Sequence, residues 1–279
     1  MNYKKGLLRL LACVLAVVMT VAVLAVPVSA IPEYKTGAND ASDAYKGGKY
    51  YQNLMNIPLS GDGVTDVLAV ALSQLGYAEG NSLDAISGTQ PGSKNYTEYY
   101  YNFGMATDTW SEEWCAAFCS WALYQSGVST QGSLNDLCRD HKGNENYIWR
   151  EISCSQWAEQ LELVGLYEKR GTYVPNSGDL IFFVSSGNIK HMGIVVWCDG
   201  STVYTVEGNT SSGNGIDGNG GGVYYKSYSL SNVGIDGYGI LPYESAETPK
   251  VDYSGKTKTA GFYMTKSEFW VAASSGGGL

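Results

Sequence analysis

The hydrophobic pattern of the chain changes its period near residue 179, and this change limits the possible folds most. Before it, apolar residues recur at helical spacing in three segments, 66–75, 111–123 and 155–163. After it, apolar and polar residues alternate in strand-length runs at 179–184, 191–197, 201–207, 223–228 and 237–241. Helices followed by an antiparallel meander predict an α+β fold, with N-terminal helices packed on an antiparallel sheet.

The first thirty residues have the pattern of an export signal. Three basic residues and no acidic one precede the apolar run 10–26, and the small residues 28–30 follow it. We expect cleavage after Ala30, which makes the protein secreted and leaves no segment inserted in a membrane. An uncleaved anchor is the alternative, because 17 apolar residues are just long enough to span a bilayer; the helix-breaking Pro27 counts against it.

The chain after the signal is acidic, and its composition suggests one folded domain between two linkers. The net charge is -9 over 279 residues, and it becomes -12 once the three basic residues of the signal are removed. Such an acidic chain lacks the basic surface that binding to nucleic acid requires. We expect 31–60 to form an N-terminal linker or arm, 61–245 to form one folded domain, and 246–279 to form a linker with an unassigned C-terminal segment.

The cysteine count gives the first chemical clue. Five cysteines remain after the signal: Cys115, Cys119, Cys138, Cys154 and Cys198. In an oxidising compartment, an odd count leaves at least one thiol unpaired. We predict that Cys115 is the free thiol and that the other four are paired or buried, with three connectivities left open. The chain has two histidines and no Cys-x-x-Cys pair, so we expect no metal site and no cofactor.

Cys115 is the candidate nucleophile because of its place in a predicted helix. Ser111 is a good N-cap for this helix, which puts Cys115 in the first turn, where the helix dipole stabilises a thiolate. Glu112 and Glu113 have the opposite effect on the thiol pKa, so a cationic partner is implied. The alternative interpretation is that Cys115 is a buried small residue or half of a disulfide.

His191 is the better of the two candidate bases, since it begins a strand just after a loop, whereas His141 lies in a charged segment. A three-residue loop at 198–200, with positive φ at Gly200, would place His191 opposite Glu207 on the next strand. Asn209 would then lie diagonally on the same face. A two-residue turn would instead put Glu207 on the other face.

Four segments, taken in order, resemble the CHAP domain (cysteine, histidine-dependent amidohydrolase/peptidase), a papain-like fold related to the NlpC-like hydrolases. The segment Trp114-Cys115-Ala116-Ala117-Phe118-Cys119-Ser120-Trp121 resembles its nucleophile motif. The segments at 178–183, 191–195 and 206–209 resemble the remaining motifs. The likeness covers about 66–243.

The resemblance implies a secreted, cell-wall-associated enzyme that cuts peptidoglycan, with Cys115 as nucleophile and His191 as base. Glu207 and Asn209 would orient the histidine. Two features depart from the family: Cys119 stands where valine is frequent, and no counterpart is seen of the glutamine that precedes the nucleophile in papain-like enzymes. Oxyanion donors beyond the Cys115 amide therefore stay unassigned.

The bond that is cut stays open between the N-acetylmuramoyl-L-alanine amide and a peptide cross-link, and the acidic charge slightly favours the cross-link. Tyr99 and Trp114 are candidates to line the substrate groove, with the aromatic core as the other interpretation. We expect a monomer. A non-enzymatic wall-binding module and a transpeptidase or transglutaminase-like enzyme are the alternative functions. The segment 217–220 is better explained as a Gly-rich turn than as a calcium loop.

Overall fold

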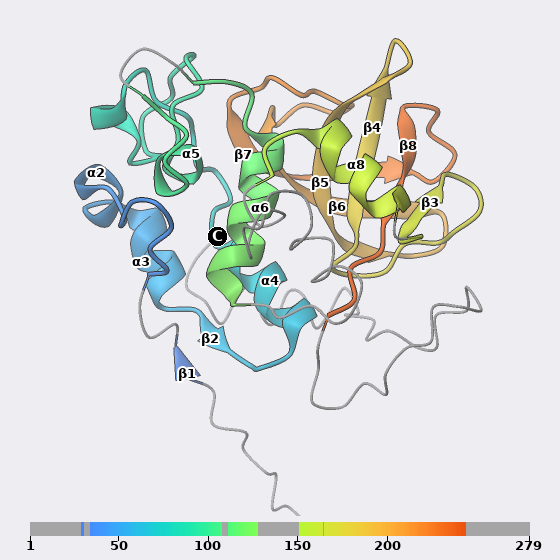
Figure 1. The fold of residues 1–279 in the computed structure, drawn as a ribbon, viewed down its shortest axis with the longest axis horizontal. Helices are drawn as coiled ribbons and strands as arrows, with labels where there is room; N and C mark the ends of the chain where they lie inside the picture. Colours follow the sequence, from blue (N-terminus) through green and yellow to red (C-terminus); the bar gives the residue numbers. More distant parts are fainter. Residues whose placement is uncertain (1–28, 31–33, 108–110, 128–150, 164, 244–279) are drawn as a thin grey trace, which may run out of the picture.

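The structure is a computed structural model that describes residues 29–30, 34–107, 111–127, 151–163 and 165–243. Its helices are α2 (Asp43–Lys46), α3 (Lys49–Met55), α4 (Gly63–Leu72), the 3-10 helix η1 (Leu83–Ala85), α5 (Glu98–Asn102), α6 (Cys115–Ser126) and α8 (Cys154–Leu163). Its strands are β1 (Ser29–Ala30), β2 (Pro58–Leu59), β3 (Tyr167–Lys169), β4 (Leu180–Ser185), β5 (Asn188–Cys198), β6 (Thr202–Thr210), β7 (Gly222–Ser229) and β8 (Ile235–Gly239). Helices packed on an antiparallel sheet make the predicted α+β fold (Figure 1).

The large sheet contains six strands in the order β3-β8-β4-β5-β6-β7, and every neighbouring pair is antiparallel. Strands β4 to β7 form the meander that the alternating pattern predicts. Strand β8 returns across the sheet to lie between β3 and β4. Strand β3 has only three residues, too few to show an alternation, and the sequence pattern therefore missed it.

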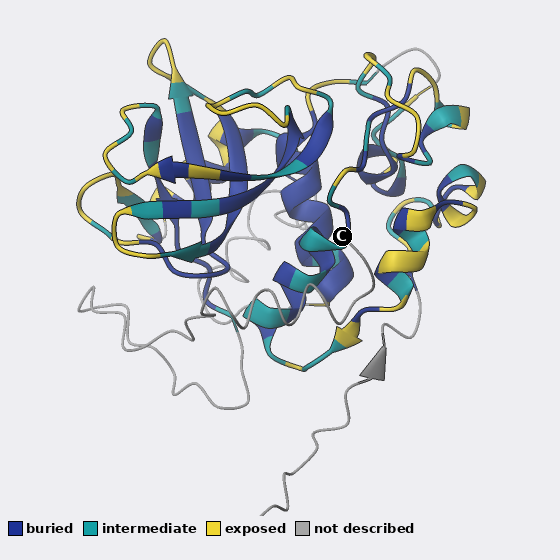
Figure 2. Cartoon of the chain, turned by 180° about the vertical axis from the view of Figure 1, so that it is seen from behind, coloured by how far each residue is buried: buried dark blue, intermediate teal, exposed yellow. Residues whose placement is uncertain are grey.

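Helix α6 lies at the centre of the fold, in contact with α4 on one side and with β5 and β6 on the other (Figure 1). All its residues except Tyr124 are buried, as the dark ribbon in Figure 2 shows. A helix enclosed on all sides can be apolar around its whole circumference. Because it is packed from several directions, its first residue is held firmly in place.

The segment expected to be a linker or arm, 31–60, has a different arrangement. It contains two helices, and Tyr45, Tyr50 and Leu54 from it belong to the main hydrophobic core. Aromatic residues at helical spacing supply enough apolar surface to pack on the domain, and the polar residues between them hid this in the sequence. The described part of the segment, 34–60, is thus packed on the neighbouring helices.

The N-terminal segment is also fixed by a buried carboxylate. Glu98, at the start of α5, accepts hydrogen bonds from Tyr34 Oη at 2.9 Å and from Ser42 Oγ at 2.7 Å. Burial raises the pKa of Glu98 to about 7, although the hydrogen bonds from Ser42 and Tyr34 oppose this shift. The carboxyl group is therefore more easily protonated in the folded chain than in the unfolded one.

This difference predicts a pH-dependent stability. The folded state binds the Glu98 proton more tightly, so the free energy of unfolding falls as pH rises from about 4.5 to about 7. Relative to Glu98→Gln, the wild type should lose on the order of 3 kcal/mol over this range, measured by urea unfolding at a series of pH values. The matched control is Glu159→Gln, at an exposed carboxylate. Parallel pH profiles for the wild type and Glu98→Gln would contradict the assignment.

Several sequence predictions lie outside the described residues: the signal before residue 29, Cys138, His141 and the segment 246–279. Within the described ranges, no helix has the length and apolar character needed to cross a membrane.

Candidate active site

Cys115 is the first residue of α6, and Trp114 is the N-cap. The predicted N-cap, Ser111, lies before the helix and donates its hydroxyl to the Asn95 carbonyl oxygen. Because the helix begins at Cys115, the backbone N–H of this residue has no acceptor within the helix. The thiol therefore lies nearer the positive end of the helix dipole than the sequence predicted.

His191 and Glu207 meet on neighbouring strands β5 and β6. His191 Nε2 lies 2.9 Å from Glu207 Oε2, and the two side chains are 1% and 0% exposed. Tyr228 Oη donates to the same carboxylate oxygen at 3.1 Å, and Thr205 Oγ1 donates to the other oxygen. The ring of Phe183 stacks on the imidazole at a centroid distance of 5.5 Å. These contacts fix both the carboxylate and the plane of the ring.

The register that produces this pair differs from the predicted one. Cys198 pairs with Val203, so the connection is longer than the three-residue loop expected at 198–200. A bulge between Val195 and Trp197 adds one residue to β5 and reverses the alternation of faces. The longer loop and the bulge together shift the pairing of β5 with β6 by two residues. Because a shift of two leaves every side chain on the same face, His191 and Glu207 still share one face of the sheet. Gly200 has the predicted positive φ, at 89°.

Gly193 makes the diagonal contact between His191 and Glu207 possible. A Cβ atom at position 193 would lie 2.5 Å from Glu207 Cγ, closer than real contacts allow. The absent side chain leaves room for the Glu207 carboxylate to cross the strand and reach the imidazole. This role of Gly193 was not predicted, because the expected register placed His191 directly opposite Glu207.

The imidazole and the thiol form the reactive pair. His191 Nδ1 is buried and has no acceptor or donor at hydrogen-bonding geometry among the described residues, so it is the nitrogen left for the thiol. Burial lowers the pKa of His191, but the nearby Cys115 thiol and the Glu207 carboxylate outweigh burial and raise the pKa to about 10. The raised pKa favours the imidazolium form of the ring, which lies between the Cys115 thiol and the Glu207 carboxylate.

A second thiol lies beside the first. Cys154, the first residue of α8, has its Sγ 3.2 Å from Cys115 Sγ. Its hydrogen bond is the largest cause that holds the pKa of Cys115 well below the usual value; burial opposes it, and His191 and the Met192 amide assist it. The odd cysteine count was the only sequence signal for this contact, and it did not single out Cys154.

The cysteines agree only partly with the expected pattern. Cys115, Cys119, Cys154 and Cys198 are all free thiols. Cys119 and Cys154 are buried, as predicted, but Cys198 is neither paired nor fully buried. Cys198 lies at the end of β5, where its Sγ accepts a hydrogen bond from the Gly200 amide.

Asn209 has a different position from the one predicted. Its Nδ2 donates to the Gly218 carbonyl at 2.8 Å, and within the described residues no hydrogen bond joins it to His191. Gly218 packs against the imidazole of His191. Asn209 therefore acts on the histidine through the loop that it holds, while Glu207 makes the direct contact.

Tyr99 and Trp114 do not line a groove in this structure. Both are fully buried, with their rings 5.5 Å apart in a cluster of aromatic side chains. Trp114 Nε1 donates to the buried carboxylate of Glu79 at 2.9 Å. The two side chains therefore belong to the aromatic core, which packs against the start of α6.

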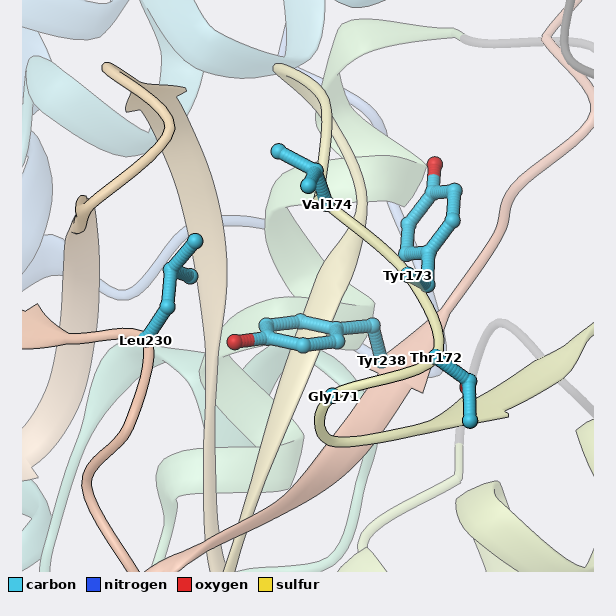
Figure 3. A pocket seen from close by; sticks show the side chains of 6 residues that line it. All are labelled: Gly171, Thr172, Tyr173, Val174, Leu230 and Tyr238. Carbon is cyan, nitrogen blue, oxygen red and sulfur yellow. The ribbon is translucent and has the colours of Figure 1, made fainter.

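A separate cavity of about 230 Å³ lies beside β8 (Figure 3). It is lined by Gly171, Thr172, Tyr173, Val174, Leu230 and Tyr238. None of the candidate catalytic residues belongs to this lining, so the cavity is distinct from the Cys115 site.

The segment 217–220 forms a turn in which Asp217 Oδ1 accepts the Asn219 amide at 3.0 Å. Among the residues that the structure describes, no group of three or more His, Cys, Asp or Glu side chains is placed to hold a metal ion.

Comparisons with known proteins bear on the same residues. Residues 107–209 match the family model of the CHAP domain, in agreement with the resemblance carried by the sequence motifs. Among solved structures, one similar chain is "The crystal structure of Ly7917", at 16% sequence identity and a TM-score of 0.33. That similarity covers 65% of this chain and 61% of the other chain. No curated protein matches the sequence.

The contact between the two thiols predicts the acidity of Cys115. Replacing Cys154 by Ala removes the largest cause that lowers the pKa of Cys115, so this pKa should rise. The rate at which iodoacetamide alkylates Cys115, followed by mass spectrometry across pH, should show its midpoint at higher pH. Cys198→Ala is the control and should leave the midpoint in place. An unchanged midpoint in Cys154→Ala would assign the low pKa to His191 alone.

Proposed function

We propose that this chain is a secreted peptidoglycan hydrolase that cleaves an amide bond with Cys115 as its nucleophile, a proposal supported by the match of residues 107–209 to the CHAP domain. The observation that carries the proposal is the arrangement of Cys115, His191 and Glu207. A thiol at a helix start, an imidazole beside it and a buried carboxylate on the far ring nitrogen are the parts that nucleophilic acyl transfer requires. The export pattern of the first thirty residues supports action outside the cell.

In the proposed reaction, the Cys115 thiolate attacks the carbonyl carbon of the substrate amide and forms a C–S bond. The negative charge that develops on the carbonyl oxygen is stabilised by the Cys115 N–H at the start of α6. His191 then donates its proton to the leaving nitrogen as the C–N bond breaks. Water attacks the thioester with His191 as base, and release of the carboxylic acid regenerates the thiolate and imidazolium.

Glu207 has two effects in this mechanism. Its Oε2 accepts from His191 Nε2, which directs Nδ1 toward the thiol, and its charge stabilises the imidazolium. Tyr228 and Thr205 hold the carboxylate in place through their hydroxyl groups. We assign Glu207 as the orienting residue and Asn209 as a support for the Gly218 loop.

Two amides in peptidoglycan fit this chemistry: the N-acetylmuramoyl-L-alanine link and a peptide bond in a stem or cross-link. Acyl transfer proceeds in the same way at both, so the contacts outside the reacting centre determine the choice. The acidic chain favours peptides with free amino groups over anionic polymers, and we therefore place the cross-link first. We propose that the protein acts as a monomer.

The reaction is tested by hydrolysis of purified peptidoglycan. Wild type should release new amino groups and soluble muropeptides, whereas Cys115→Ala and His191→Ala should each lose nearly all turnover, because they act as one unit. Cys198→Ala should retain activity. Mass spectrometry of the products identifies the bond.

Wild-type activity in Cys115→Ala would contradict the proposal. So would new reducing sugars in place of new amino groups, since they indicate a glycosidase. A wall-binding module without activity would sediment with insoluble peptidoglycan in both forms and would release nothing from it.

The carboxylate has a measurable role of its own. Glu207→Gln keeps the size of the side chain but removes the charge, so kcat should fall by about 10²- to 10⁴-fold. The kcat of Asn209→Ala should fall much less, because no hydrogen bond joins Asn209 to the imidazole among the described residues. Initial rates on a defined muropeptide, together with circular dichroism to confirm folding, provide the measurement. An equal fall in kcat in the two variants would instead indicate that Asn209 acts directly on His191.

A further inference from the structure

The contact between Cys115 and Cys154 brings together two thiols from different helices. Their sulfurs are 3.2 Å apart, and each residue is the first of its helix, α6 or α8. A disulfide requires an S–S distance near 2.05 Å, so the sulfurs need to approach by about 1.1 Å. We expect rotation of the two side chains to supply this movement.

We propose that Cys115 and Cys154 form a redox modification site, in which a hydroperoxide converts the two thiols into a reversible disulfide. The disulfide itself depends only on the two cysteines. Its consequence rests on the proposed function: with Cys115 in a disulfide, the nucleophile of the hydrolase is absent, and the enzyme is inactive until it is reduced.

The reaction balances in two steps. The Cys115 thiolate attacks one oxygen of the hydroperoxide, the O–O bond breaks, and the products are a sulfenic acid on Cys115 and an alcohol, or water from hydrogen peroxide. The Cys154 sulfur then attacks the sulfenic sulfur, an S–S bond forms, and hydroxide leaves and takes up the Cys154 proton as water. Two thiols and one hydroperoxide give one disulfide, one alcohol and one water.

The surroundings assign different parts to the two cysteines. The contact with Cys154 lowers the pKa of Cys115, and His191, which lies beside Cys115, lowers it further, so Cys115 is the sulfur that reacts first. Cys154 is the neighbour that resolves the sulfenic acid before a second oxidation can occur. Cys119, one turn later on α6, is fully buried, and among the described residues the hydrogen-bonding distance from the Cys115 sulfur to another thiol is the one to Cys154.

The compartment fits this chemistry. Outside the cell, no glutathione pool keeps thiols reduced, so a disulfide persists once it has formed. An unprotected thiolate in the same place would proceed to the sulfinic acid, which simple thiols do not reduce. A resolving cysteine therefore preserves the nucleophile in a form that a dithiol reductant can restore.

The experiment uses the full secreted chain. The protein is reduced, freed of reductant and treated with about two equivalents of hydrogen peroxide, the amount that oxidation of one thiol to a sulfinic acid consumes. Iodoacetamide then blocks the remaining thiols. Digestion without reductant and mass spectrometry should show the Cys115 and Cys154 peptides joined, with the loss of two hydrogens. Dithiothreitol should separate them and restore alkylation of Cys115.

Two variants provide the comparison. In Cys154→Ser, the same dose should convert Cys115 to the sulfinic acid, and dithiothreitol should no longer recover the thiol. Cys198→Ser should behave as the wild type, since its sulfur is outside the site. Cys154→Ala serves as a second replacement if the serine variant does not fold.

Two results would overturn the proposal: sulfinic acid at Cys115 in the wild type to the same extent as in Cys154→Ser, or a disulfide from Cys115 to a different cysteine. The mapping needs no substrate. If Cys115→Ala keeps full wall hydrolysis, the proposed function fails while the mapped disulfide stands. If the disulfide does not form, the hydrolase proposal is unaffected.

Discussion

The enclosure of α6 between α4 and the sheet is the constraint on which the rest of the site depends. A helix packed on all sides cannot rotate or slide without opening a cavity in the core, at a cost of several kcal/mol. Its first residue is thereby fixed against β5 and β6, which carry His191 and Glu207. The nucleophile and base come from segments far apart in the chain, and the shared core keeps them in contact.

The charges of the site are balanced almost entirely inside the protein. Glu207, His191 and Cys115 are each at most 2% exposed, so water contributes little to their solvation. An isolated ion at this depth is costly, whereas an alternating row of carboxylate, imidazolium and thiolate supplies a counter-charge for each member. The arrangement also requires neighbouring side chains to move before a substrate carbonyl can reach the sulfur.

The sequence predicted the order of elements well because hydrophobic period reports directly on helices and strands. It misplaced the start of α6, since Ser111 is a good N-cap by residue type but its hydroxyl is engaged by Asn95. It also gave the wrong loop at 198–200, because a β-bulge leaves no clear trace in an alternating pattern. The prediction that His191 and Glu207 share one face was nevertheless correct. The longer loop and the bulge each reverse the face, so their effects cancel. Contacts between distant segments, such as that of Cys154 with Cys115, leave no periodic signal.

The second thiol affects the nucleophile in two ways that share one cause. A donor 3.2 Å from the Cys115 sulfur stabilises the thiolate, and a more stable thiolate is present in larger fraction at neutral pH. A larger thiolate fraction also reacts faster with peroxides, so the hydrogen bond that prepares Cys115 for attack on an amide exposes it to oxidation as well. The same proximity places Cys154 where it can resolve the oxidised sulfur. The contact between Cys115 and Cys154 therefore both activates the nucleophile and protects it from further oxidation.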